Sequence, residues 1–178
     1  MIRESAPAKV NLVLQVGQRR DDGLHEICSL FASLELADEL VFQAGDGAAD
    51  SVRCEGVEGE NLVIAALRLF RERADANLPP LHVEIDKRIP VAGGMGGGSA
   101  DAAAALRAAN ELAGRPLDAD ALRRLAAGVG ADVPSKVEPA HAAGQPAPHP
   151  RVRRAAQPRA RPELPDRRQH PRRHRPRR

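Results

Sequence analysis

The sequence predicts an α+β fold for residues 1–138, because segments with strand periodicity and segments with helical periodicity share this part of the chain. Residues 9–16 and 81–86 alternate apolar and polar side chains, as half-buried strands do. Residues 62–74 carry apolar side chains at helical spacing, and residues 102–112 contain only strong helix formers and one Asn. A glycine-rich segment separates the second of these strands from the second helix, and it is the most distinctive feature of the chain.

The first strand, residues 9–16, is expected to face the core with every second side chain, which places Lys9 and Asn11 together on the opposite face. The expected core-facing side chains are Val10, Leu12, Leu14 and Val16. A turn over residues 17–23 then leads to His25. Further strands are expected at 27–36, 40–42 and 51–54, the first two joined through residues 37–39.

Residues that favour helix ends lie at the expected helix boundaries. Asn61 is placed to cap the helix at 62–74, and Asp118 to cap the last expected helix. Gly114 is expected just past the C-terminus of the helix that follows the glycine-rich segment. The only aromatic residues in the sequence are three Phe. We therefore expect a core that is aliphatic and rich in alanine.

Five of the six residues from Gly93 to Gly98 are glycine, a composition that neither a helix interior nor a strand interior favours. Ser99 is expected to cap the helix that follows. Glycine allows the backbone to approach a ligand closely, and the N–H groups at a helix start carry partial positive charge. The order strand, glycine loop, helix start therefore predicts a phosphate-binding loop.

Three other interpretations of this loop fit less well. A P-loop requires Lys after its last glycine, whereas Gly98 is followed by Ser99 and Ala100. The dinucleotide-binding pattern G-x-G-x-x-G has no register here, because the Gly-Met-Gly run at 94–96 places Ser at the sixth position. A flexible linker is not expected between an alternating strand and a helix. The segment is best interpreted as an anion-binding loop of another nucleotide-binding class.

The charge of the chain is divided unevenly. Residues 1–138 carry 15 Lys and Arg against 22 Asp and Glu, while residues 139–178 carry 12 Arg against two acids. The latter segment also holds nine Pro, and it has too few apolar side chains to offset a chain entropy of ~1–2 kcal/mol per residue, so we expect it to be disordered. Clustered Arg could bind nucleic acid nonspecifically, but the acidic body and the scarcity of aromatics argue against this as the main function.

Residues 1–5 contain no apolar run of the signal-peptide type, and no stretch of the chain is long enough to span a membrane. We therefore expect a cytoplasmic protein without a membrane partner. Cys28 and Cys54 show no metal-binding spacing and are expected to be buried, reduced thiols.

Four motifs occur in the order found in one family: Ala6-Pro7-Ala8-Lys9-Val10-Asn11-Leu12, Asp22-Gly23-Leu24-His25, the segment 90–100, and Gly130-Ala131-Asp132-Val133-Pro134. On these motifs, residues 5–135 resemble the GHMP kinases. The resemblance is strongest to the members that act on a CDP-linked methylerythritol in the non-mevalonate route to isoprenoids.

The resemblance implies an N-terminal domain related to ribosomal protein S5 and a ferredoxin-like C-terminal domain. It also implies ATP as co-substrate, with Mg²⁺, and transfer of the γ-phosphate to the 2-hydroxyl of the substrate. Asp132 would be the catalytic base, with Lys9 as its partner, while Asn11 and His25 would bind the substrate, His25 at the cytosine. ATP would lie against Pro90, Val91, Ala92, Gly93, Gly94, Met95, Gly96, Gly97, Gly98, Ser99 and Ala100.

The sequence departs from the family at two places. Leu24 stands where an aromatic residue is common beside the histidine, and the hydrophobic continuation expected after Pro134 is replaced from Ser135-Lys136 onward. We expect the chain to be a truncated kinase of impaired activity, without the C-terminal domain. The alternative is a noncatalytic nucleotide-binding remnant.

Overall fold

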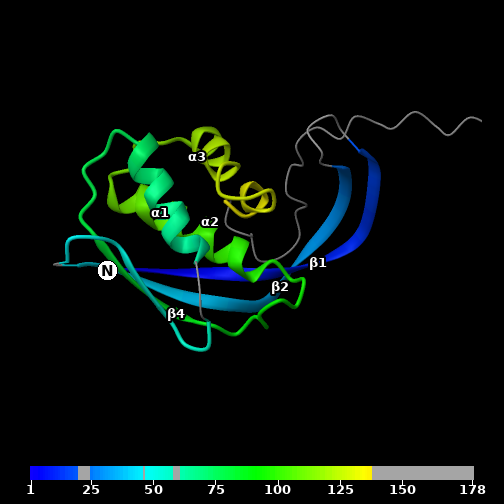
Figure 1. Cartoon of the computed structure of the whole chain (residues 1–178), viewed down its shortest axis with the longest axis horizontal. Helices are drawn as coiled ribbons and strands as arrows, with labels where there is room; N and C mark the ends of the chain where they lie inside the picture. The colour runs from blue at the N-terminus through cyan, green and yellow to red at the C-terminus, as the bar shows by residue number, and fades with distance from the viewer. Residues whose placement is uncertain (20–24, 46, 58–60, 138–178) are drawn as a thin grey trace, which may run out of the picture. The chain divides into compact units, whose positions relative to one another are not determined.

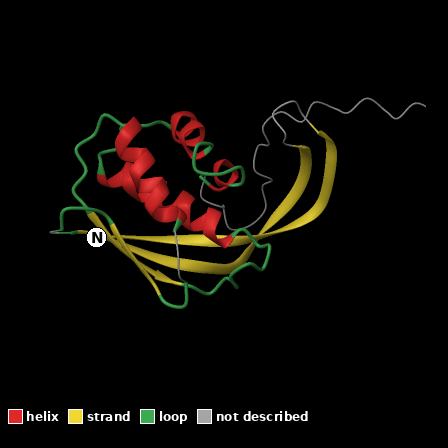
Figure 2. Cartoon of the chain, in the orientation of Figure 1, coloured by secondary structure: helices red, strands yellow, loops and turns green. Residues whose placement is uncertain are grey.

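The computed structural model describes residues 1–19, 25–45, 47–57 and 61–137. These residues form a sheet of four strands with the helices on one of its faces (Figures 1 and 2). The strands are β1 (Ile2–Arg19), β2 (His25–Ala44), β3 (Ser51–Cys54) and β4 (Leu81–Asp86). The helices are α1 (Leu62–Arg73), α2 (Gly97–Leu112), α3 (Ala119–Ala126) and the short 3₁₀ helix η1 (Val133–Lys136). The turn expected at 17–23 is wrong at its start, because residues 17–19 belong to β1; its remaining residues and the tail at 139–178 fall outside the described residues.

The sheet is mixed, with the strand order β1-β2-β4-β3. β1 pairs antiparallel with β2, and β2 pairs antiparallel with β4. β3 and β4 run parallel, and α1 supplies the crossover connection that parallel neighbours require. The α+β class predicted from the sequence is confirmed.

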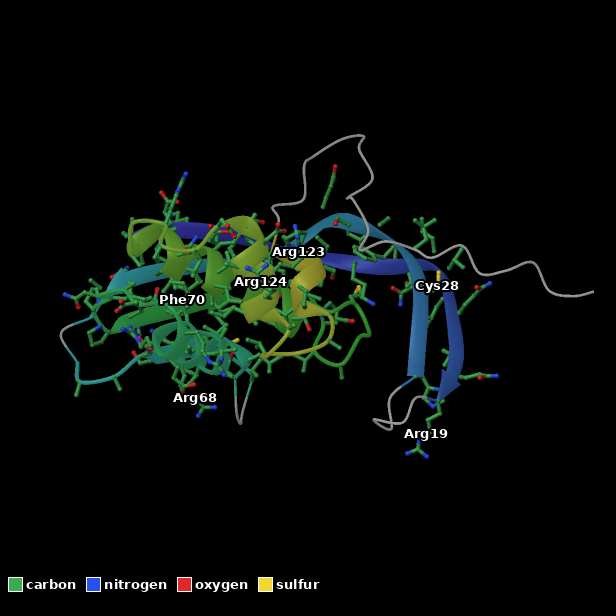
Figure 3. The ribbon with its side chains drawn as sticks, turned by 90° about the horizontal axis from the view of Figure 1, so that it is seen from above. Arg19, Cys28, Arg68, Phe70, Arg123 and Arg124 are labelled. Carbon is green, nitrogen blue, oxygen red and sulfur yellow. The ribbon has the colours of Figure 1, made fainter. Side chains whose placement is uncertain are left out.

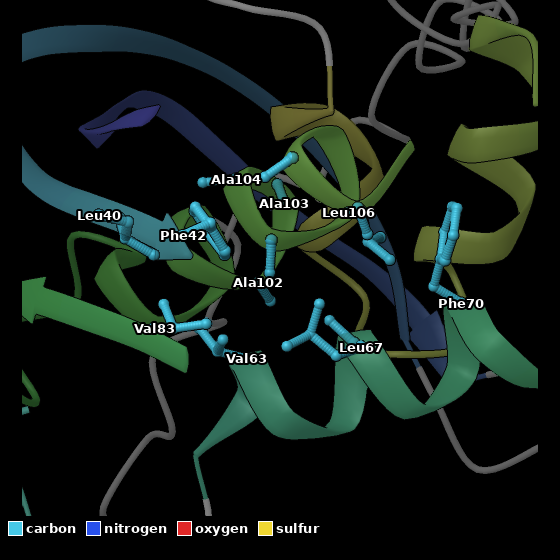
Figure 4. Packing of buried hydrophobic residues seen from close by; sticks show 14 of the residues in the cluster. Leu40, Phe42, Val63, Leu67, Phe70, Val83, Ala102, Ala103, Ala104 and Leu106 are labelled. Atoms are coloured by element: carbon cyan, nitrogen blue, oxygen red, sulfur yellow. The ribbon is translucent and has the colours of Figure 1, made fainter. Parts of the chain in front are cut away.

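The core lies between the sheet and the helices α1 and α2, and Figure 4 shows its packing. Phe42 and Val83 reach it from the sheet, and Val63 and Leu67 from α1. The side of α2 that meets them is nearly all alanine, so its backbone packs closely against both neighbours. Its buried alanines are Ala100, Ala102, Ala103, Ala104, Ala105, Ala108 and Ala109. The expected aliphatic, alanine-rich core is confirmed.

The outer halves of β1 and β2, residues 10–19 and 25–32, form an arm that extends past the helices (Figures 1 and 3). The prediction that the alternating residues of this segment face a core is wrong. Their exposed fractions run from 37% at Val10 to 61% at Leu12 and Val16. In the part of the chain that the structure describes, no helix covers the arm, whereas Ala6 and Ala8 on the inner half of β1 are fully buried.

Three local predictions are also corrected. β2 is one continuous strand through residues 37–39, because Asp38 is buried and bonded rather than exposed in a turn. α2 begins two residues before Ser99, with Gly96 at the N-cap in the left-handed conformation at φ 69°. Neither cysteine is buried: Cys28 is exposed on the arm (Figure 3) and Cys54 is half-buried, and both are free thiols.

The helix boundaries otherwise follow the capping residues. The Asn61 side chain accepts a hydrogen bond from the Val63 N–H at 2.9 Å, and Asp118 accepts one from the Ala121 N–H at 2.7 Å. Gly114 follows the end of α2 with φ at 82°, as a glycine after a helix C-terminus often does. None of the helices among residues 1–137 that the structure describes is long and apolar enough to cross a membrane.

A buried ionic cluster ties the start of α2 to the sheet. Lys87, just after β4, contacts the carboxylates of Asp38 on β2 and Asp101 on α2, at 2.5 and 2.7 Å. Asp38 also accepts the backbone N–H groups of Arg88 and Ile89. Burial raises the pKa of Asp101 to about 7, although Lys87 opposes the shift, and its Oδ1 has no partner within the described structure.

The raised pKa of Asp101 predicts a pH dependence of stability. Its ordinary value is 3.8, so between about pH 4 and pH 7 the folded chain holds a proton that the unfolded chain has released. The contribution of this group to the unfolding free energy is therefore full below pH 4 and is lost as the pH rises towards 7. Urea unfolding of the full chain should show this loss, and Asp101→Asn should flatten it. An unchanged pH profile in the variant would contradict the assignment.

Candidate active site

The glycine loop ends where α2 begins. Ala92, Gly94 and Gly96 all have positive φ, between 61° and 71°, so the backbone turns tightly before the helix. The first intrahelical bond runs from the Ala100 N–H to the Gly96 carbonyl at 3.0 Å. The N–H groups of residues 97–99 therefore have no partner within the helix and form its positive end.

Lys9 joins β1 to this loop. Its backbone N–H donates to the Met95 carbonyl at 3.0 Å, and its Cε lies 3.4 Å from the position that a Cβ on Gly96 would occupy. Gly96 therefore combines a left-handed backbone with close side-chain approach, two conditions that favour glycine. The register between β1 and β2 shifts just before Lys9. Pro7 pairs with Ala37 and Lys9 pairs with Ser33, so β2 advances four residues where β1 advances two. This irregularity helps to direct the Lys9 side chain.

Asp132, at the start of η1, lies next to Lys9. Asp132 Oδ2 lies 3.8 Å from Lys9 Nζ, with the Asp132 side chain 59% exposed and the Lys9 side chain 13% exposed. Asp132 stands at the N-cap of η1, yet its carboxylate makes no capping bond. Its backbone carbonyl instead accepts the Ser135 hydroxyl at 2.7 Å. The carboxylate thus lies at the surface beside a lysine ammonium group.

Asn11 completes the group on β1. Lys9 Nζ donates to Asn11 Oδ1 at 3.0 Å, and the Ser29 hydroxyl on β2 donates to the same oxygen at 3.2 Å. Asn11 therefore orients the ammonium group of Lys9. Of the residues that the sequence singled out, Lys9, Asn11, Asp132 and the glycine loop are brought together.

His25 lies apart from this group. It pairs with Arg19 at the far end of the arm, and its Nδ1 lies 3.2 Å from the Gly17 carbonyl. Arg19 stands ten positions after Lys9 on β1, so His25 is far from the lysine along the strand. The expected contact of His25 with a cytosine stays a prediction.

Sequence reasoning missed a second lysine at the site. The Cε of Lys136 lies 3.1 Å from the position that a Cβ on Gly96 would occupy. Burial, with the nearby charge of Lys9, lowers the pKa of Lys136 to about 8. The only signal in the sequence was that Lys136 follows Asp132 by four residues. This spacing brings the two side chains near each other only if a short helix lies between them, which the sequence does not indicate strongly.

Residues 61–141, which include the glycine loop and Asp132, match the family model described as "GHMP kinases N terminal domain". The chain contains a GHMP kinase N-terminal domain. The resemblance is thereby confirmed for the two motifs in this range, 90–100 and 130–134.

Relatives of the GHMP kinase domain extend the match to the strands that precede it. The chain is 46% identical over 137 residues to the 4-diphosphocytidyl-2-C-methyl-D-erythritol kinase of Kineococcus radiotolerans, covering 72% of this chain and 42% of the relative. The enzyme of the same name from Nitratidesulfovibrio vulgaris is 48% identical over 130 residues, covering 71% and 45%. The chain thus spans less than half the length of the curated relatives it matches.

A solved structure agrees with these relatives. The crystal structure of a 4-(cytidine 5'-diphospho)-2C-methyl-D-erythritol kinase is 40% identical and superposes with a TM-score of 0.64. The match covers 76% of this chain and 48% of that one. The GHMP kinase fold of residues 1–137 is therefore supported by both sequence and structure.

Proposed function

We propose that this chain takes part in ATP-dependent phosphoryl transfer to the hydroxyl group of a small molecule. The observation that carries the proposal is the pair Lys9 and Asp132, 3.8 Å apart and next to Gly96 at the positive end of α2. Phosphoryl transfer requires positioning and charge neutralisation more than covalent help from the protein. The site supplies both: the N–H groups of residues 97–99 and the Lys9 ammonium group can neutralise phosphate charge, and the Asp132 carboxylate can position the hydroxyl group.

In the proposed reaction, the N–H groups of residues 97–99 bind phosphate oxygens of ATP. The substrate hydroxyl oxygen forms a bond to the γ-phosphorus while the bond from this phosphorus to the β,γ-bridging oxygen breaks, and ADP leaves. Asp132 accepts the proton of the hydroxyl group. Lys9 pairs with the Asp132 carboxylate at 3.8 Å and is itself oriented by Asn11.

We further propose that the substrate is 4-diphosphocytidyl-2-C-methyl-D-erythritol, phosphorylated on its 2-hydroxyl, with His25 at the cytosine. Support comes from the names of the curated relatives, which are 40–48% identical to this chain. Among the described residues, no group of three or more His, Cys, Asp or Glu side chains could hold a metal ion. Because Mg²⁺ is commonly held by one or two carboxylates together with substrate phosphates, we propose that it enters with ATP.

An assay of the purified full chain tests this function. The chain is incubated with ATP, Mg²⁺ and the methylerythritol substrate, and ADP and phosphorylated product are measured together. Equal amounts of both, formed only when the substrate is present, are expected. ATP binding without product would favour the noncatalytic nucleotide-binding alternative. Binding of any DNA without binding of ATP would favour the nucleic-acid alternative and contradict the proposal.

A further inference from the structure

Two lysine side chains converge on the last residue before α2. The position of a Cβ on Gly96 would lie 3.1 Å from Lys136 Cε, 3.5 Å from Lys136 Nζ and 3.4 Å from Lys9 Cε. The two lysines come from opposite ends of the domain sequence, Lys9 from β1 and Lys136 from the end of η1. Both ammonium groups therefore lie beside the positive end of the same helix.

The backbone at Lys136 is held in place from several sides. Its carbonyl accepts a hydrogen bond from Arg107 on α2 at 2.8 Å, and Arg107 also pairs with Glu4 on β1 at 2.7 Å. Val133 and Val137, on either side of it, are buried in the core. The path of the chain thus delivers the Lys136 side chain to Gly96 rather than leaving it in solvent.

Without a bound anion, the positive charge of Lys136 is electrostatically unfavourable at this position. Within the described part of the chain, no carboxylate lies within 4.0 Å of Lys136, and its Nζ has one weak contact, the Pro7 carbonyl at 3.5 Å. Lys9, burial and the helix start all disfavour a second positive charge here, while Asp132 and Asp101 offset them only in part. A group with several negative charges would relieve this repulsion.

We propose that Lys136 binds the terminal phosphate of the nucleotide together with Lys9. This inference rests on the proposed function and adds to it a residue that lies outside the four motifs, the last of which is Gly130-Ala131-Asp132-Val133-Pro134. In the transfer step described above, the Lys136 ammonium group donates a hydrogen bond to a nonbridging oxygen of the γ-phosphoryl group and remains protonated. It touches the anion and takes no part in the proton transfer to Asp132.

Binding measurements on the full chain test the role of Lys136. Isothermal titration with ATP and with inorganic tripolyphosphate at pH 7 should show at least tenfold weaker binding to Lys136→Gln. Adenosine should bind the variant and the wild type equally. Arg68→Gln removes the same charge from an exposed position on α1 (Figure 3) and should change neither affinity more than twofold. Circular dichroism of each variant serves as the control for folding.

The pH profile separates binding by a charged Lys136 from a merely structural role. The groups facing its ammonium are Lys9 on β1, Asp132 before η1 and Asp101 on α2. Because Lys136 loses its proton above about pH 8, tripolyphosphate affinity of the wild type should fall between pH 7 and pH 9.5. Lys136→Arg stays charged and should retain its affinity across this range, whereas Lys136→Gln should be uniformly weak.

A second measurement requires no variant. Acetic anhydride acetylates neutral amines, and mass spectrometry locates the modified lysines, so at pH 8 ATP should protect Lys136 from acetylation. Unaltered ATP affinity in Lys136→Gln, or acetylation of Lys136 at the same rate with and without ATP, would overturn this inference and leave the proposed function standing. Failure of the wild-type chain to bind ATP at all would overturn both.

Discussion

Replacing Asp132 by Asn is expected to lower the rate of phosphoryl transfer by about 10²–10⁴-fold, the usual contribution of a positioned general base. Asn has the same shape as Asp but cannot accept the proton of the substrate hydroxyl. Because the Asp132 side chain is 59% exposed and caps no helix, the substitution should leave the fold intact. The measurement is the initial rate of substrate-dependent ADP formation at saturating ATP, with the wild type assayed beside the variant.

A matched control distinguishes loss of the base from loss of charge. Asp75→Asn removes one carboxylate from an exposed position after α1 and should leave the rate unchanged. The affinity of Asp132→Asn for ATP should stay within about twofold of the wild type, or become slightly tighter, because the carboxylate repels phosphate. A variant that keeps more than a third of the wild-type rate would show that Asp132 is not the base.

The sequence was sufficient for features that depend on neighbours along the chain. Asn61 and Asp118 were recognised as caps because a capping side chain bonds an N–H two or three residues ahead. The strand at 81–86 was recognised because one of its faces is buried throughout. The glycine loop was recognised because its conformation requires glycine at Gly94 and Gly96.

Features that depend on distant segments could not be predicted in this way. Alternation along residues 9–16 indicates a strand but does not say whether a helix covers it, and the arm extends beyond the helices. Asp38 and Lys87 are 49 residues apart, so their ion pair has no local signature. Lys136 reaches Gly96 only because Arg107 and two buried valines fix the backbone around it. Such contacts are set by packing rather than by local pattern.

Replacing Lys87 by Met is expected to destabilise the folded chain by about 3–5 kcal/mol, because it leaves two buried carboxylates without their cation. Asp38 is fully buried and Asp101 is 3% exposed, so water cannot take over the role of the lysine. Met keeps most of the length and volume of the side chain, which limits the change to the charge. The loss is a large share of the ~5–15 kcal/mol by which domains are stable. Urea unfolding at pH 8 measures it as a lower midpoint.

The neighbouring residue provides the control. Arg88 also pairs with an aspartate, Asp86, at 2.7 Å, but this pair is exposed to solvent, so Arg88→Met should change the midpoint little. If burial of unpaired charge is the cause, adding Asp101→Asn to Lys87→Met should restore part of the stability. Lowering the pH to 5 should do the same, because the raised pKa of Asp101 lets its carboxylate bind a proton in the folded state at that pH. If Lys87→Met and Arg88→Met lowered the urea midpoint equally, or if Lys87→Met recovered no stability at pH 5, the cluster would not anchor α2 electrostatically.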